Sequence, residues 1–143
     1  SQDEGFHLLN ALIGEDTLLV AYNIQFDLGC LESFYRKFLN PKYEIKNDVL
    51  DVMAVYKDRH RYPHRLESAI AKYNINLVNS HRALDDVKAT YEVLRVMNDE
   101  LPNVNKYINV IGFNKKYGVS GKRLNHVKYV AQYGGYREIE KLT

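Results

Sequence analysis

The chain of 143 residues is long enough for a single domain with a buried core. Hydrophobic residues make up 45% of it and charged residues 27%, a composition ordinary for a soluble globular protein. No apolar run approaches the roughly 20 residues that cross a bilayer, and no signal peptide precedes the first predicted helix. The one cysteine, Cys30, cannot form an internal disulfide, which predicts a cytoplasmic location, and its apolar neighbours predict a buried side chain.

The net charge of +2 hides two parts of opposite sign. Residues 1–103 hold 12 Lys and Arg against 16 Asp and Glu, whereas residues 104–143 hold 8 against 2. The second part is also rich in tyrosine, so it could neutralise phosphates and stack on bases, or equally serve as a solvated linker. We therefore divide the chain into an α/β domain, residues 1–103, and a basic C-terminal extension, residues 104–143, expected to lie outside the core.

The first part of the chain predicts a helix, a strand and a second helix. Apolar residues at helical spacing predict a helix over residues 3–13 that a glycine ends. A continuous apolar run over residues 17–22 predicts a strand that is buried on both faces. The amphipathic stretch of residues 26–38 predicts a helix that ends before an Asn-Pro pair.

The next elements alternate in the same way. Residues 49–56 predict a strand that turns into a helix, residues 65–73 a short helix, and residues 82–100 a long amphipathic helix. Strands that alternate with helices are typical of a parallel α/β arrangement. Beyond the last helix the pattern weakens, with candidate strands over residues 107–112 and 126–132.

Two carboxylates and an imidazole stand at the ends of these elements. Asp27 falls where a predicted strand gives way to a helix, the edge at which open α/β sheets bind ligands; alternatively, it only stabilises the helix dipole. His81 and Asp86 lie about 140° apart on an ideal helix, so they can converge only if His81 precedes the helix. Asp86 then faces the core, where a carboxylate requires a metal or a partner. Such groups suit metal-assisted hydrolysis.

The peptides VAYNIQFD and HRALDD together resemble the second and third motifs of the DEDDh branch of the DnaQ-like 3′–5′ exonucleases. This superfamily of proofreading nucleases has a ribonuclease H-like fold. The resemblance implies that Asp27 and Asp86 bind metal and that His81 is the general base. It further implies that Asn23 and Phe26 contact the substrate.

The resemblance covers about residues 6–100 but lacks the family's first motif, an Asp-x-Glu pair on an early strand. Two acidic pairs occur upstream of Asp27, but their members are adjacent rather than spaced by one residue: Asp3-Glu4 and Glu15-Asp16. We therefore expect a ribonuclease H-like α/β exonuclease fold that lacks its first three strands. Its exposed sheet edges would then favour association with a polymerase or with a second copy of the chain.

The resemblance implies a metal-dependent exonuclease that hydrolyses phosphodiester bonds at the 3′ end of a nucleic acid, with DNA favoured over RNA. In the complete enzyme two Mg²⁺ or Mn²⁺ ions would bind at the reacting phosphate. With two carboxylates only, this chain by itself is expected to bind metal weakly or not at all and to be inactive. The absent first motif favours an alternative, a non-catalytic nucleic-acid or protein-interaction module on the same fold.

Overall fold

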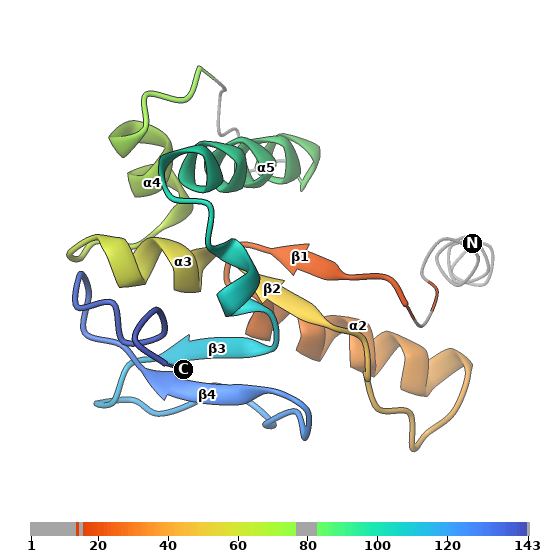
Figure 1. Ribbon diagram of the computed structural model, residues 1–143. Coiled ribbons are helices and arrows are strands. Elements are labelled where there is room, and N and C mark those ends of the chain that lie inside the picture. Colours follow the sequence, from red (N-terminus) through yellow and green to blue (C-terminus); the bar gives the residue numbers. More distant parts are fainter. Residues whose placement is uncertain (1–13, 15, 77–82, 143) are drawn as a thin grey trace.

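The computed structural model describes residue 14, residues 16–76 and residues 83–142 (Figure 1). The predicted first helix, residues 3–13, lies outside the described residues. In chain order the elements are β1 (Leu19–Ala21), α2 (Ile24–Phe38), β2 (Val49–Asp51), α3 (Val52–Arg59), α4 (Leu66–Lys72), α5 (Ala83–Glu100), the 3-10 helix η1 (Val104–Tyr107), β3 (Val110–Phe113) and β4 (Lys128–Ala131).

The fold is mixed α/β with two small sheets. Strand β1 pairs in parallel with β2, and β3 pairs in parallel with β4. Helices α4 and α5 lie together above the strands in Figure 1, and β3 and β4 lie below β1 and β2. The parallel pairing of β1 with β2, with α2 between them in sequence, agrees with the prediction of a parallel α/β arrangement.

Strand β1 is less buried than its apolar sequence predicts. All three residues of β2 are buried, but Val20 in β1 is 44% exposed and Leu18 beside it is 41% exposed. Within the described residues β1 has a neighbouring strand on one side only, because its sheet contains β1 and β2 alone. The expectation of burial on both faces is therefore wrong for β1. A free edge of this kind is open to pairing with another strand.

The C-terminal segment belongs to the core. Tyr107 and Ile139 are buried in one hydrophobic cluster with residues of α3 and α5, and Ile111 and Val127 are buried in a second cluster with residues of α2 and β2. The expectation that the extension would lie outside the core is therefore wrong for these residues. Strands as short as β3 and β4 give too little periodicity to reveal burial. The domain boundary at residue 103 stays a prediction.

A buried carboxylate attaches this segment to α3. Asp58 is fully buried and accepts hydrogen bonds from four donors of the C-terminal segment. These are Tyr107 Oη at 2.8 Å, Gln132 Nε2 at 2.7 Å, and the backbone N–H groups of Ile139 at 3.2 Å and Glu140 at 2.8 Å. Buried polar groups are stable only when they are paired in this way, so Asp58 fixes the path of the chain after β4.

Asn109 connects the two sheets. Its backbone N–H donates to Val49 O at 2.8 Å, and its side-chain Oδ1 accepts from the N–H of Val49 at 3.0 Å. Its carbonyl oxygen accepts from the N–H of Lys128 at 2.9 Å. The backbone of Asn109 is left-handed, with φ at 60°, a conformation that asparagine tolerates better than most residues. One residue thus fixes β2 against the start of β4.

The expectation for Cys30 needs correction. Cys30 is exposed on α2 rather than buried. None of the helices among the described residues is both long and apolar enough to cross a bilayer.

Candidate functional site

The turn between β1 and α2 is fixed by a carboxylate from the neighbouring strand. Asn23 caps α2 in a left-handed conformation, with φ at 67°. The backbone N–H groups of Asn23 and Ile24 donate to Asp51 Oδ1 at 2.9 and 3.2 Å. Asp51 ends β2, and because β1 and β2 are parallel, the two carboxyl ends meet at one edge of the sheet. Asp51 therefore sets the direction in which α2, and with it Asp27, leaves the sheet.

Asp51 is a residue that our sequence reasoning did not single out. It is fully buried and also accepts from the backbone N–H of Met53 at 3.1 Å, which caps α3. Burial raises the pKa of Asp51 to about 6, although the three backbone N–H groups and Lys57 act to lower it. The available signal was a carboxylate inside the apolar run of residues 49–56, where an acid without a partner is costly.

Asp27 and Asp86 line the same hollow. Asp27 lies in the first turn of α2 and Asp86 in the first turn of α5, about sixty residues later in the sequence. The hollow has a volume of about 740 Å³ and lies between β1, α2, α4 and α5. The rest of its wall includes six residues, most of them apolar: Val20, Ala21, Tyr22, Leu66, Thr90 and Leu94. The fold thus brings the two predicted metal-binding carboxylates to one cavity.

The two carboxylates differ in their surroundings. Asp86 Oδ1 is buried and has no hydrogen-bond partner among the described residues. Asp27 is more exposed, and the partial burial of its carboxyl group raises its pKa, partly offset by a hydrogen bond from its own backbone. An unpartnered buried oxygen is costly unless something outside the described chain binds it.

Tyr22 also lines the hollow and attaches it to the loop before α4. Its hydroxyl donates to His64 O at 2.6 Å, which fixes the loop that leads into α4. Burial is the largest of several effects that raise the pKa of Tyr22, so this phenol stays protonated as a donor. Most of this loop is exposed, including Arg61, Tyr62 and Arg65. His60 and His64 are half-buried, with His60 Nε2 at 2.5 Å from Tyr73 Oη and His64 Nε2 at 2.8 Å from His60 O.

The remaining predicted site residues are Asn23, Phe26 and His81. Asn23 forms the turn before α2, and Phe26 is 70% exposed on its first turn. His81 lies outside the described residues. Sequence resemblance alone therefore supports its role as a base.

The chemistry of the hollow fits a hard divalent cation in part. Carboxylate oxygens are the ligands that Mg²⁺ and Mn²⁺ prefer, and the unpartnered oxygen of Asp86 provides one. The described residues, however, contain no group of three or more His, Cys, Asp or Glu that could hold a metal. Asp27 and Asp86 therefore offer two of the ligands that a metal centre needs.

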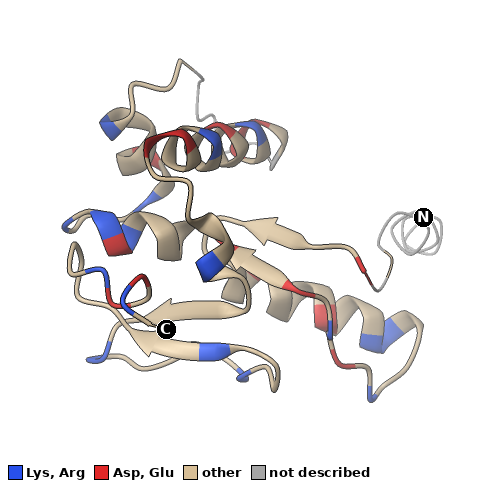
Figure 2. Ribbon diagram, viewed as in Figure 1, with Lys and Arg blue, Asp and Glu red and all other residues tan. Residues whose placement is uncertain are grey.

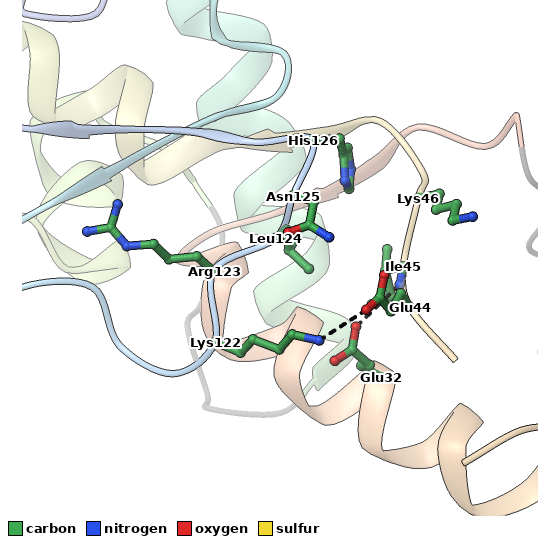
Figure 3. Close-up of a pocket in the computed structure, with 9 residues that line it drawn as sticks. All are labelled: Glu32, Glu44, Ile45, Lys46, Lys122, Arg123, Leu124, Asn125 and His126. Atoms are coloured by element: carbon green, nitrogen blue, oxygen red, sulfur yellow. Dashed lines mark hydrogen bonds and ion pairs between the residues drawn. The ribbon is translucent and has the colours of Figure 1, made fainter. Parts of the chain in front are cut away.

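A second hollow, of about 310 Å³, lies between Glu32 of α2, residues 44–46 and residues 122–126 (Figure 3). The two acidic side chains that line it are already paired with basic side chains. Glu32 pairs with Arg36 at 3.1 Å and accepts from the backbone N–H of Ile45 at 3.3 Å, and Glu44 pairs with Lys122 at 3.4 Å. Because their charges are compensated within the protein, this hollow is a poorer candidate for a cation site than the one that contains Asp86.

Comparison with known proteins supports a nuclease. The exonuclease family RNase T matches residues 1–94. The DNA polymerase III PolC-type of Bacillus subtilis is 39% identical over 92 residues, which are 61% of this chain and 6% of that protein. The PolC-type polymerase of Latilactobacillus sakei is 32% identical over 106 residues, 73% of this chain and 7% of that protein. That of Clostridium perfringens is 29% identical over 137 residues, 90% of this chain and 9% of that protein.

The chain thus spans less than a tenth of the length of these relatives. No solved structure matches it.

Proposed function

Because this chain belongs to the RNase T family of exonucleases, we propose that it carries the second and third motifs of a metal-dependent 3′–5′ exonuclease acting on DNA. The observation that carries the proposal is the shared hollow. Asp27 and Asp86 reach it from two helices, and Asp86 Oδ1 is buried there with no partner among the described residues. The names of the polymerase relatives support DNA as the substrate.

Each residue has a distinct role in this proposal. Asp27 and Asp86 hold the metal, and His81 accepts the proton of the attacking water. Asn23 and Phe26 contact the last nucleotides of the strand. Two divalent ions, when bound, would supply charge stabilisation at the scissile phosphate and lower the pKa of water.

The proposal includes an incomplete metal centre. The 143 residues contain no Asp-x-Glu pair upstream of Asp27, and the described part of the β1 sheet has two strands. We propose that the first three strands of the family fold, with that acidic pair, are absent from these residues. Two carboxylates then bind Mg²⁺ only in the millimolar range, with water completing its coordination.

The test is to restore the first motif. A fusion of this chain to a three-stranded segment that carries an Asp-x-Glu pair should release nucleotides from the 3′ end of a labelled strand, and a chelator should stop it. His81→Ala in the fusion should lower the turnover number by about 10²–10⁴-fold, because the base that takes the proton is lost. Unchanged turnover would remove His81 from the mechanism.

The second candidate is a non-catalytic module that binds nucleic acid or protein. It is favoured by the lack of an Asp-x-Glu pair upstream of Asp27 in the 143 residues. If the fused protein still binds DNA but releases no nucleotide in Mg²⁺ or Mn²⁺, this candidate replaces the first.

A further inference from the structure

The loop between β3 and β4, residues 114–127, lies in a part of the chain that is strongly basic. Residues 101–137 contain seven Lys and Arg and no Asp or Glu. Figure 2 shows this concentration of blue along the loop and on β4. Five exposed residues of this region form what we call the basic ledge: Lys115, Lys116, Tyr117, Arg123 and Lys128.

Two cations of the ledge, Lys116 and Arg123, lie over aromatic rings. The guanidinium of Arg123 lies over the rings of Phe113 and Tyr129, at 5.8 and 5.2 Å from their centroids. Figure 3 shows the side chain of Arg123 pointing away from the acids of the second hollow, whereas Lys122 points towards them. A guanidinium stacked on rings keeps its N–H edge open to a phosphate.

The exposed end of the ledge combines a cation with a ring. Lys116 Nζ lies 5.4 Å from the ring centroid of Tyr117, and Tyr117 is 77% exposed. Alternating cations and exposed rings are typical of surfaces that bind single strands, because cations bind phosphates while rings stack on bases. An acidic protein partner would need the cations but not the exposed ring.

A glutamine attaches the loop to the helix that carries Asp27. Gln25 Nε2 donates to Ser120 O at 2.8 Å and to Lys122 O at 2.9 Å. Tyr129 Oη in turn donates to Gln25 Oε1 at 3.1 Å. Gln25 lies in the first turn of α2, two residues before Asp27, so the loop is fixed directly beside the start of this helix.

Phe26 follows Gln25 and precedes Asp27 in the first turn of α2. Phe26 is exposed and lines a shallow hollow together with Ser120, Gly121 and Lys122 of the loop.

We propose that the basic ledge binds the sugar-phosphate backbone of a single nucleic-acid strand whose 3′ end lies across Phe26 towards Asp27. The C-terminal segment is then part of the substrate interface rather than a linker. The direction of the strand rests on the proposed exonuclease function, whereas binding by the ledge requires no catalysis.

The first test measures binding alone. The 143-residue chain is titrated with a fluorescent oligothymidylate of about 12 nucleotides in the presence of a chelator, at several salt concentrations. Lys115→Gln with Lys116→Gln should reduce the slope of log K against log salt by about 1.4, since each phosphate contact to a single strand contributes about 0.7. The matched control, Lys37→Gln with Lys72→Gln, removes the same charge from α2 and α4 and should leave the slope unchanged.

A third variant separates nucleic acid from other polyanions. Tyr117→Ala should keep the salt slope but weaken binding about fivefold or more, because one stacked base is lost. If the Lys115/Lys116 variant and the Lys37/Lys72 variant give equal salt slopes, the proposal that the basic ledge binds the strand is overturned. A reduced slope with no effect of Tyr117→Ala would also overturn it, because the surface would then bind polyanions in general rather than a single strand. Thermal unfolding of each variant shows whether the fold is intact.

The second test reads the direction of the strand. Cys30 is the one cysteine of the chain, is exposed, and lies one helical turn after Phe26. A fluorophore on Cys30 should be quenched more by an oligothymidylate with a quencher at its 3′ end than by one with a quencher at its 5′ end. Equal quenching, or stronger quenching from the 5′ end, overturns the proposed direction. Failure of binding with normal nucleotide release by the fused enzyme would overturn the ledge but not the exonuclease.

Discussion

Replacement of Asp58 by alanine should destabilise the protein strongly. Asp58 is fully buried and accepts from Tyr107, Gln132, Ile139 and Glu140, all of the C-terminal segment. Asp58→Ala removes the acceptor of all four donors. Gln132 keeps a second hydrogen bond, from its Nε2 to the backbone carbonyl of Ala54, so three donors lose their acceptor. Three donors without acceptors at roughly 1–3 kcal/mol each, partly relieved by water in the space left, predict a loss of about 3–5 kcal/mol.

Urea unfolding followed by circular dichroism measures this loss. A domain of this size is stable by about 5–15 kcal/mol, so the variant should unfold at a much lower urea concentration. Asp99→Ala is the control, because Asp99 makes only an exposed ion pair with Arg95 on α5 and should cost less than about 1 kcal/mol. A loss below 1 kcal/mol in Asp58→Ala would refute the view that Asp58 attaches the C-terminal segment.

Three further predictions concern the candidate site. The pKa of Asp51 is raised to about 6 in the folded state, so between about pH 4 and pH 6 the folded state binds a proton that the unfolded state has lost. The free energy of unfolding should therefore fall as pH rises through this range. Asp51→Asn should flatten that decrease, measured by urea titrations at several pH values. Asp86→Asn should abolish weak Mn²⁺ binding, measured by paramagnetic relaxation, whereas the control Asp85→Asn should not. Asp86→Asn should also raise the free energy of unfolding, because it removes the charge of a buried carboxylate whose Oδ1 has no partner among the described residues. The chain by itself should show no chelator-sensitive exonuclease activity; robust activity would mean that another chain or acid completes the site.

The regular elements could be predicted because their signal is local. Helical spacing gave α2 within two residues of its start and α5 within one. The strand that turns into a helix was predicted over residues 49–56, and β2 and α3 begin there. Both signals depend on residues that are neighbours in the sequence, which periodicity detects.

The predictions that failed concern features that depend on residues far away in the sequence. Exposure of β1 depends on whether a strand lies beyond it, which an apolar run cannot report. Burial of Tyr107 depends on Asp58, 49 residues away in the sequence. Cys30 lies on the exposed side of α2 because the strands pack on the other side of that helix. Sequence periodicity describes the face of one element but not what covers it.

Helix α3 connects the candidate site with the chain on either side of the β3–β4 sheet. Asp51 at its start holds the turn that leads to Asp27, and Asp58 in its last turn holds the segment that follows β4. The two buried carboxylates thus support separate parts of the molecule from one short helix. Loss of Asp58 removes contacts of the segment that contains the ledge, while the hydrogen bonds of Asp51 to the β1–α2 turn are untouched. The two ends of α3 thus hold different parts of the chain, the β1–α2 turn at Asp51 and the residues around β3 and β4 at Asp58.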